Sequence, residues 1–451
     1  MDVERLRSHF DFVRTGRVVT NNAASTQPPR ELLDLYRSLV PWYENVHRGQ
    51  SGASRRTTGL FESAYDTIAG WLNAPGRRTI ATYRNTTEAI NAVMYSLLTE
   101  FRDGDNVVTT MMEHNSNFVP WYALGREILP RFGRRVQCRL ARFDQAGRLD
   151  LAHLASLVDS RTKLVCCTGA SNFFGSKPDL GTVRRIADAS GYRQPDGTRR
   201  SLLLVDGAQQ APSSAVDVRA LDLDYYAFSF HKMLAPFGVG VLYAKEHLLR
   251  GALPFLYGGD MIAEGQVAPD RVAYNDLPWK YAAGTPNILG VIVSAQALRL
   301  LVDLVDPADP APGRPYFGSG DPLPHPVVRR AMAEVGRHTR QLTERALSRL
   351  RDIAGLTVYG PPTASERTPL VSFTIAGISP FTVAEALDRY GVESRAGCHC
   401  ATLAHRALGL DPPASCRLSF AVYNTVQDVD RATGAVARIA ETATQGWVGS
   451  Y

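Results

Sequence analysis

Lysine is scarce in this sequence: of its 50 basic side chains, only five are lysines, at positions 163, 177, 232, 245 and 280. All the others are arginines, which bind anions but do not form covalent bonds to carbonyl compounds as an amine does. Each of the five lysines is therefore a candidate for covalent chemistry.

Cysteine, long apolar runs and charge of one sign are also sparse. Six cysteines in 451 residues do not form a disulfide framework, so we expect reduced thiols. Residues 1–17 mix acids and bases, and no stretch of eighteen apolar residues occurs, which predicts neither a signal peptide nor a membrane span and favours the cytoplasm. The formal charge of +6 is spread thinly, without a basic stripe, which argues against a nucleic-acid partner.

The composition is that of a globular protein, with 45% hydrophobic and 21% charged residues. From about residue 79, strand-like and helical patterns alternate. The runs 164–167 and 202–205 lack polar alternation, as expected of parallel strands covered on both faces. This predicts an α/β fold, with a three-layer αβα domain and a mostly parallel sheet over residues 20–295. We expect strands at 79–83, 106–110, 135–140, 164–168, 201–205, 225–229 and 238–243, and helices at 87–98, 117–129 and 183–190.

The last third of the chain has a different pattern. A helical run at 294–304 precedes a stretch rich in proline and glycine at 306–326, which indicates a surface insertion or linker. A helix at 327–353 and strands at 356–359 and 370–375 predict a smaller α+β domain over residues 296–451. We expect residues 1–19 to pack with this domain.

Two ionisable residues follow predicted strands in the larger domain. Asp206 ends the run 202–205, and Lys232 follows the strand 225–229. Ligands of open α/β sheets bind outside the carboxyl ends of the strands. An acid and an amine there suit pyridoxal 5'-phosphate (PLP), with Lys232 bound to the aldehyde and Asp206 paired with the pyridinium nitrogen. A buried ion pair or a strand-end cap is the alternative reading.

Polar residues near two helix starts extend this pattern. Asn85 and Thr86 stand where a strand turns into a helix, so hydroxyl and N–H groups there could hold a phosphate, joined by Ser229 and His231. By itself Asn-Thr-Thr-Glu is a helix-capping sequence. His114 also follows a strand, where it could stack on the cofactor ring or move protons, although a lone histidine can equally be a cap.

Together these motifs resemble fold-type I, class V PLP enzymes, most closely the cysteine desulfurases and selenocysteine lyases of the SUF-type group. The resemblance runs nearly end to end. Besides the residues above, it rests on Asn22-Ala-Ala, Asn45-Val-His47-Arg-Gly, Ser171-Asn172, Gly258-Gly-Asp-Met-Ile262, Ala283-Gly-Thr285-Pro-Asn287, Arg395-Ala-Gly-Cys-His-Cys400-Ala and Cys416-Arg417 through Asn424-Thr.

The resemblance implies a role for each matching residue. Lys232 would be the Schiff-base lysine, and His114 the stacking and proton-handling histidine. Further cofactor contacts would come from Asp206, from Gln209 at the phenolic oxygen, from Asn85, Thr86, Ser229 and His231 at the phosphate, and from Thr285 of the second subunit of a homodimer. The substrate, L-cysteine or an analogue, would be bound by Asn172, Arg417, Arg395 and His47.

The sulfur-accepting cysteine of the family corresponds to Cys400, which would become a persulfide while L-cysteine is converted to L-alanine, with a sulfur-acceptor protein as a possible partner. A structural thiol is the alternative. Cys398-His399-Cys400 could be half of a metal site, but no second cluster at ligand spacing appears, so we expect no metal. A selenocysteine lyase, another PLP-dependent lyase, epimerase or aminotransferase-like enzyme, and a non-enzymatic scaffold remain open.

Three segments depart from the family pattern. Cys398 stands where the family more usually has histidine, which places a second thiol two residues from Cys400. Residues 233–238 carry bulkier apolar groups than the usual Leu-Tyr-Gly-Pro-Thr-Gly, which predicts a different substrate mouth. Residues 192–200 and 306–326 are apparent insertions.

Overall fold

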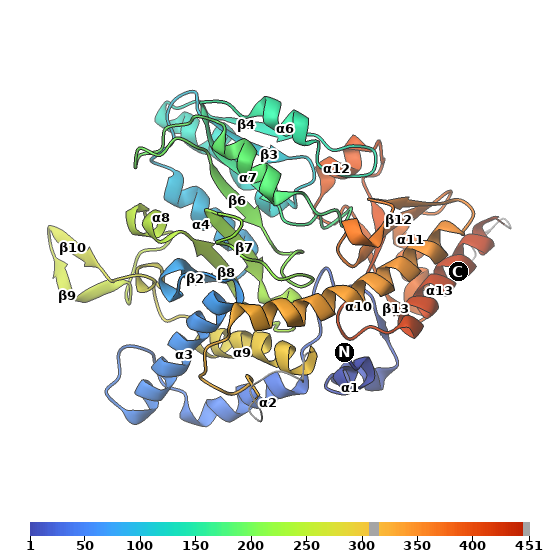
Figure 1. The fold of residues 1–451 in the computed structure, drawn as a ribbon, viewed down its shortest axis with the longest axis horizontal. Helices are drawn as coiled ribbons and strands as arrows, with labels where there is room; N and C mark the ends of the chain where they lie inside the picture. The colour runs from blue at the N-terminus through green and yellow to red at the C-terminus, as the bar shows by residue number, and fades with distance from the viewer. Residues whose placement is uncertain (306–314, 445–451) are drawn as a thin grey trace.

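A seven-stranded sheet forms the centre of the protein (Figure 1). The structure is a computed structural model that describes residues 1–305 and 315–444. The strands lie in the order β2-β8-β7-β6-β5-β3-β4, and all run in one direction except β8, which is antiparallel to both neighbours. Their bounds are Ile80–Tyr83 (β2), Asn106–Thr110 (β3), Gln137–Ala141 (β4), Thr162–Thr168 (β5), Leu202–Asp206 (β6), Tyr225–Ser229 (β7) and Gly240–Ala244 (β8).

Both faces of this sheet are covered. Leu203 and Val205 of β6 pack into one core, and Leu202 and Leu204 pack into another on the opposite face. Because side chains alternate along a strand, a strand buried on both faces is apolar throughout. The three-layer α/β fold is thereby confirmed. The helices of this part are α2 (Arg30–Leu39), α3 (Gly52–Trp71), α4 (Thr86–Leu97), α5 (Val119–Ala123), α6 (Leu151–Leu157), α7 (Leu180–Asp188), α8 (Glu246–Gly251) and α9 (Ile288–Val305).

One helical prediction holds only in part, because most of the predicted stretch is helical but not α-helical. The run 117–129 contains only the short helix α5, followed by a π turn over Leu124–Ile128 and a 3-10 turn over Leu129–Phe132. Prolines at the starts of α5 and of the 3-10 turn remove backbone donors. A Cβ at Gly125 would stand 2.5 Å from the carbonyl oxygen of Val136, so the chain passes close to its neighbour there.

The helix α9 is the most apolar of the chain. It is long and apolar enough to cross a membrane, but 83% of it is buried within the fold, against α2, α3 and α10 (His325–Arg351). Its hydrophobicity is therefore that of a core helix. The domain boundary expected at residue 295 falls inside α9. Along α10, the buried side chains up to Val335 belong to the core of the large sheet, and those from Leu342 onward belong to a second core. The change of core lies within α10.

The second core belongs to a four-stranded sheet with the order β11-β12-β15-β14. All its neighbouring strands are antiparallel. Its elements are β11 (Leu356–Tyr359), β12 (Leu370–Ile375), α11 (Pro380–Arg389), β13 (Val392–Glu393), β14 (Arg395–Gly397), α12 (Thr402–Ala407), β15 (Ser415–Ser419) and α13 (Val426–Thr444).

The N-terminal segment contacts both parts of the protein. After α1 (Val3–Arg7), the strand β1 (Val18–Val19) pairs in parallel with β13. Arg7 forms an ion pair with Asp428, with Nη1 at 2.6 Å from Oδ2. The ring of Phe10 packs against Tyr423, and its side chain belongs to the core of the large sheet. The beginning of the chain thus joins the two cores.

The apparent insertions are attached to the body of the protein. Of 306–326, residues 306–314 lie outside the described residues. Beyond them, the backbone N–H groups of Tyr316 and Phe317 donate to the carboxylate of Asp303, and Arg299 donates to Asp321 O, both from α9. In 192–200, Tyr192 donates its hydroxyl to Asp105. These contacts give both segments a structural role.

A hairpin not foreseen from the sequence projects from the large sheet (Figure 1). It consists of β9 (Ile262–Ala268) and β10 (Arg271–Tyr274), which pair antiparallel. Most of its side chains are exposed, so no buried face produced a pattern that could have predicted it.

Asn22 ties the N-terminal segment to the C-terminal one. Its Nδ2 donates to Val19 O, Ser419 O and Asn424 Oδ1, and its Oδ1 accepts from the hydroxyl of Tyr423. The side chain is 4% exposed, so each partner that loses its bond would stay buried.

We expect Asn22→Ala to lower the free energy of unfolding by about 3 kcal/mol, since it strands several buried polar groups at once. Urea denaturation followed by circular dichroism measures this. Asn91→Ala is the control, because that amide makes a single hydrogen bond to Thr87 O one turn earlier in its own helix. Equal urea midpoints for the two variants would contradict the role given to Asn22.

Candidate active site

The cavity at the carboxyl ends of β6 and β7 gathers most of the predicted residues. Asp206 is the last residue of β6, and Lys232 ends the 3-10 turn Phe230–Lys232 that follows β7. Because β6 and β7 are parallel neighbours, their ends lie at the same edge of the sheet. The cavity has a volume of about 190 Å³, and its lining includes Asn85, Thr86, His114, Asn172, Asp206, Gln209, Ser229, His231 and Lys232.

Asp206 is a buried carboxyl group. Its Oδ1 accepts from the backbone N–H of Ala208 at 3.0 Å, and its Oδ2 lies 3.4 Å from Ser116 Oγ. Burial raises the pKa of Asp206 because it penalises the charged form, while the Ala208 N–H and the charge of Lys232 act in the opposite direction. A cationic partner at this carboxyl would favour its ionised form.

Lys232 is a half-buried amine whose Nζ has no hydrogen-bond partner among residues 1–305 and 315–444. Burial lowers its pKa from 10.5 to about 8; Asp206 opposes this shift, and the positive charges of Arg417 and Arg395 add to it. The neutral, nucleophilic amine is therefore populated close to physiological pH. Both arginines belong to the small domain, so charges of that domain lower the pKa of an amine in the cavity.

The start of α4 forms one end of the cavity. Asn85 caps the helix, with its Oδ1 accepting from Glu88 N, and the N–H of Thr86 donates to Ser229 Oγ at 2.8 Å. The Thr86 and Ser229 hydroxyls are 2.6 Å apart. The ring of His231 lines the same end, and burial lowers its pKa to about 4. Hydroxyl groups at a helix N-terminus suit an anion.

His114 stands beside Lys232 and Asp206 as a neutral ring. Burial lowers its pKa to about 3, helped by the charge of Lys232. Its Nδ1 accepts from the backbone N–H of Ser116 at 3.1 Å, so the ring proton is on Nε2. Ser116 Oγ is 2.8 Å from the same Nδ1 and also contacts Asp206. Sequence reasoning missed Ser116, because a serine two residues after a histidine carries no distinctive signal.

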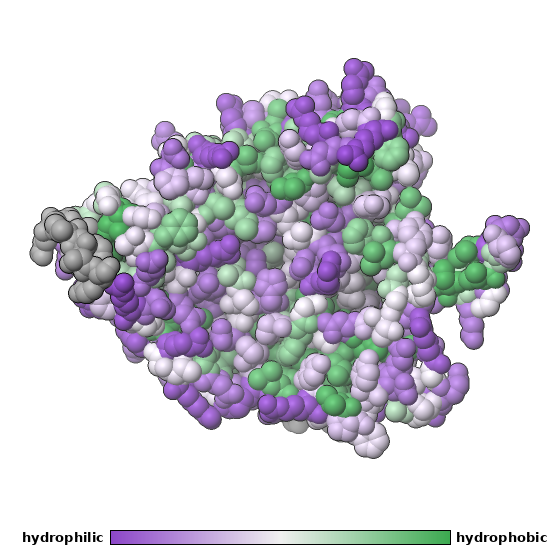
Figure 2. Space-filling model, turned by 180° about the vertical axis from the view of Figure 1, so that it is seen from behind, coloured by the Kyte–Doolittle hydropathy of each residue, from purple (hydrophilic) through white to green (hydrophobic). Residues whose placement is uncertain are grey.

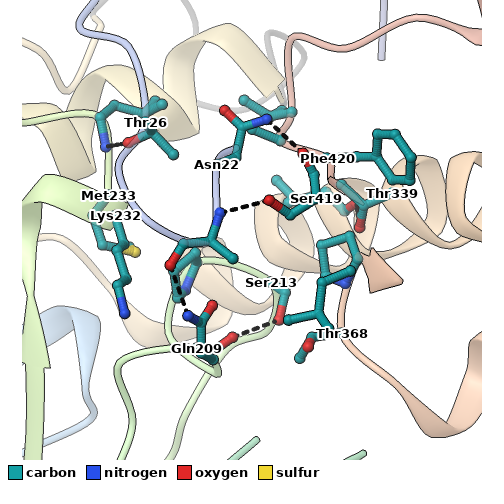
Figure 3. A pocket seen from close by; sticks show the side chains of 18 of the residues that line it. Asn22, Thr26, Gln209, Ser213, Lys232, Met233, Thr339, Thr368, Ser419 and Phe420 are labelled. Carbon is teal, nitrogen blue, oxygen red and sulfur yellow. Dashed lines mark hydrogen bonds between the residues drawn. The ribbon is translucent and has the colours of Figure 1, made fainter. Parts of the chain in front are cut away.

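Gln209 borders both this cavity and a smaller one behind it (Figure 3). Its Nε2 donates to Ala23 O at 2.8 Å. Met233 and Leu234 line the smaller cavity and are buried, with the N–H of Leu234 donating to Thr26 Oγ1. The bulky residues after Lys232 therefore fill space behind the lysine, and neither Met233 nor Leu234 lines the main cavity.

Arg417 brings free donors to the site from the small domain. Its Nη1 donates to the backbone oxygen of Asn172 at 2.6 Å, while Nε and Nη2 are buried and have no partner in the part of the chain that the structure describes. Burial lowers the pKa of Arg417 to about 9, and the charge of Arg395 adds to this effect. Asn172 Nδ2 donates to His399 O, which leaves its Oδ1 without a partner. A buried guanidinium with two free N–H groups suits a carboxylate.

Cys400 lies in a loop that the small domain lays against the large one. Its backbone oxygen accepts from the N–H of Asn115, next to His114, at 2.7 Å. Arg395 Nη2 is 3.8 Å from Cys400 Sγ. Both His399 and Cys400 have left-handed φ angles, of 51° and 58°. Non-glycine residues rarely adopt such angles, which gather at functional loops.

Five predicted residues do not line this cavity. Arg395, Cys400 and Arg417 belong to the adjoining small domain, whereas His47 and Thr285 lie in another part of the large one. His47 pairs with Glu62, and its ring lies 4.4 Å from that of Trp279. Thr285 is exposed in the loop before α9. The two share one region, because Arg48 binds Asp260 and the N–H of Gly284 donates to Gly259 O.

The residues described contain no group of three or more histidine, cysteine or acidic side chains placed to hold a metal ion. His399 instead bonds through Nε2 to Ser415 Oγ at 3.0 Å. The half metal site considered from the sequence has no further ligands in this part of the chain.

Comparison with known proteins agrees with the geometry of this site. The model of the aminotransferase class-V family matches residues 18–306 and 327–432, leaving out most of the insertion. The chain belongs to the aminotransferase class-V family. It is 35% identical to the cysteine desulfurase of Haloferax volcanii over 441 residues, which cover 96% of this chain and 92% of that protein.

Solved structures agree with this assignment. One is the cysteine desulfurase CsdA (S-sulfonic acid) of Escherichia coli, with a TM-score of 0.81, 30% identity and coverage of 98% of this chain and 99% of that chain. Another is the apo cysteine desulfurase of Thermococcus onnurineus NA1, with a TM-score of 0.83, 27% identity and coverage of 97% and 98%. The fold-type I architecture and the dependence on PLP predicted from the sequence are thereby confirmed.

The residues present fit this cofactor. A half-buried amine of lowered pKa suits the aldehyde, a buried carboxyl suits a pyridinium, and hydroxyl groups at the start of α4 suit a phosphate. Each of these features is a property of the protein itself.

The lowered pKa of Lys232 has a measurable effect on cofactor binding. We expect the rate at which the apoprotein takes up PLP covalently to rise with pH with a midpoint at about 8, because only the neutral amine attacks an aldehyde. Asp206→Asn should move the midpoint to lower pH, since the carboxylate raises this pKa. Absorbance of the bound cofactor after rapid mixing gives the rates. Lys177→Arg should leave the profile unchanged, and a wild-type rate still rising toward pH 10 would refute the assignment.

Proposed function

We propose that this protein is a cysteine desulfurase, which converts L-cysteine to L-alanine and transfers the sulfur to Cys400. The contact between Asn115 and Cys400 O carries the proposal, because it fastens a partly exposed cysteine to the loop of His114 at the lysine cavity. The relatives named cysteine desulfurases support it. The motif from Arg395 to Cys400 favours the SUF-type group.

Arg417 would bind the carboxylate of the amino acid. Its Nε and Nη2 are buried and unpartnered, so an arriving carboxylate satisfies both and pairs with a charge that burial disfavours. The bond from Nη1 to Asn172 O holds the guanidinium in place. Asn172, through its amide, and Arg395, through its charge, complete this side of the site.

Two groups can move protons at the substrate Cα. Lys232, with its pKa lowered to about 8, can accept a proton on Nζ near neutral pH. His114 carries its proton on Nε2 and, with a pKa of about 3, remains neutral. We assign the exchange of the Cα proton to Lys232, and the stacking and orienting contact to His114.

Sulfur transfer would use Cys400 as the nucleophile. Its thiolate attacks the sulfur of the substrate, the bond between that sulfur and Cβ breaks, and the electron pair remains with the carbon fragment, which takes up protons to become alanine. Cys400 thereby gains one sulfur atom as a persulfide, and no outside oxidant is needed. The guanidinium of Arg395, 3.8 Å from Sγ, puts a positive charge beside the reacting sulfur.

When bound, PLP withdraws electrons from the substrate Cα and so weakens the bonds that must break. Lys232 would hold its aldehyde, Asp206 its ring nitrogen, and Gln209 its phenolic oxygen. Asn85, Thr86, Ser229 and His231 would hold the phosphate.

A second copy of the chain would complete the site. His47 and Thr285, which lie away from their own cavity, share one face with the exposed aromatic residues Trp42, Tyr43 and Tyr257. The projecting hairpin carries exposed apolar side chains at Val267 and Val272. Figure 2 shows hydrophobic surface on this projection, which lies on the right in that view. A partly apolar face of this kind is typical of an interface. We propose a homodimer in which each chain supplies His47 and Thr285 to the other.

Cys400→Ser should abolish steady-state formation of alanine from L-cysteine, because serine cannot form the persulfide. Alanine is measured by amino-acid analysis, with absorbance of bound cofactor as proof that the site remains intact. Cys138→Ser is the matched control, since burial raises the pKa of that thiol to about 12 and it lies on the edge strand β4. Unchanged turnover of cysteine by Cys400→Ser would refute the proposal and favour another class V activity.

The shared site can be tested by complementation. The variant Lys232→Ala should be inactive because each chain lacks the lysine of its own site. The double variant His47→Ala with Thr285→Ala should be inactive because each chain damages the site of its partner. When the two inactive variants are unfolded together and refolded as a mixture, hybrids should regain part of the alanine formation. No recovery in a mixture that sediments as dimers would contradict the exchange of residues.

A further inference from the structure

Cys398 is a second thiol of the loop that carries Cys400. Both are partly exposed, as is Cys138, whose pKa burial raises to about 12, whereas Cys166, Cys167 and Cys416 are buried. Burial raises the pKa of each of these three thiols. The pair 398 and 400 is therefore the reactive part of the cysteine content of this chain.

The surroundings of Cys398 favour its thiolate. Burial acts against the charged form, but hydrogen bonds from the Thr402 side chain and the Cys400 backbone, together with the charge of Arg395, outweigh it, so that the pKa of Cys398 is lowered. Arg395 is the same guanidinium whose Nη2 lies 3.8 Å from Cys400 Sγ. The positive charge of Arg395 therefore lies close to both sulfur atoms.

The residue between the two cysteines is fixed from both ends. The ring of His399 is buried and bonds to Ser415 Oγ, and its backbone oxygen accepts from Asn172 Nδ2. The N–H of Ala401 donates to Cys398 O at 2.7 Å, which closes a turn around His399 and Cys400. This turn holds the two thiols on either side of an anchored residue.

The two thiols face different surroundings. Cys400 bonds through its backbone oxygen to Asn115, at the cavity. Gly397, which precedes Cys398, lies beside Phe381, whose side chain is 51% exposed. The loop is therefore bonded to the segment of His114 at Cys400, and its other end, before Cys398, lies beside an exposed side chain.

We propose that Cys398 is a second sulfur-carrying residue, which takes the transferred sulfur from Cys400 and presents it at the surface. The inference rests on the desulfurase function proposed above. The Cys398 thiolate attacks the outer sulfur of the Cys400 persulfide, a new S–S bond forms to Cys398, the bond to Cys400 Sγ breaks, and Cys400 leaves as a thiolate. The sulfur moves as a persulfide, with no net oxidation and no added reagent.

Geometry favours this exchange over a disulfide. In the exchange the moving sulfur bridges the two Sγ atoms, which then stand about two S–S bond lengths, ~4 Å, apart. A disulfide would need them at ~2 Å with a constrained dihedral angle. Residues two apart have Cα atoms at most ~7 Å from each other, and the longer bridge demands less approach of the two sulfur atoms than a disulfide does.

The test is to locate the sulfur. The holoenzyme is mixed with L-cysteine, quenched with an alkylating agent and digested, and fragmentation of the peptide after Arg395 shows which cysteine carries one extra sulfur atom. We expect the label on Cys398 as well as on Cys400 in the wild type, on Cys400 alone in Cys398→Ala, and on neither in Cys400→Ala. A second readout uses a small protein with one exposed thiol as acceptor.

In Cys398→Ala, the first turnover of alanine should keep its wild-type rate, while sulfur transfer to the protein thiol should fall several-fold. Cys138→Ser, the matched control, should transfer sulfur as the wild type does. Label confined to Cys400 in the wild type, a Cys398–Cys400 disulfide as the main product, or undiminished transfer by Cys398→Ala would each overturn the proposal. A wild-type enzyme that forms no alanine from cysteine would instead overturn the desulfurase function itself.

Discussion

The burial of an amine and a carboxyl group at neighbouring strand ends is the constraint on which this site depends. Lys232 is half-buried and Asp206 is buried, and burial disfavours the charged form of each. A cofactor that binds one covalently and presents a cationic nitrogen to the other relieves both costs. The parallel pairing of β6 with β7 brings these residues to one edge of the sheet, so the fold itself places both groups where one cofactor can bind them.

The small domain is held over this edge by a few backbone contacts. Asn172 joins it through two bonds, accepting from Arg417 and donating to His399 O, and Asn115 donates to Cys400 O. The donors of Arg417 and the Cys400 loop are therefore positioned by the same residues that border the cofactor cavity. With the roles proposed for Arg417 and Cys400, substrate binding and sulfur transfer would depend on the same set of contacts.

Sequence patterns predicted the parts of the fold whose burial is regular. The strands at 106–110 and 225–229 were predicted with the bounds observed for β3 and β7. The helix predicted over 117–129 is α-helical only in α5, because prolines and the close approach at Gly125 interrupt the regular pattern. The exposed hairpin had no buried face to reveal it.

The site was predictable in its residues but not in its contacts. Nine predicted residues line the cavity, because strand ends and helix starts confine where polar groups gather. The role of Ser116 between His114 and Asp206, and the two free donors of Arg417, depend on tertiary approach. Such approach joins segments far apart in the chain, which no local pattern records.

The pairing of β1 with β13 has a consequence for biosynthesis. Val18 leaves the ribosome long before its partner, Val392, has been made. The amide of Asn22 can likewise bond to Ser419 and Asn424 only after those residues have been made. Contacts between such distant segments form late and slowly. The segment around Val18 and Asn22 therefore cannot form these contacts until the chain beyond Asn424 has been made.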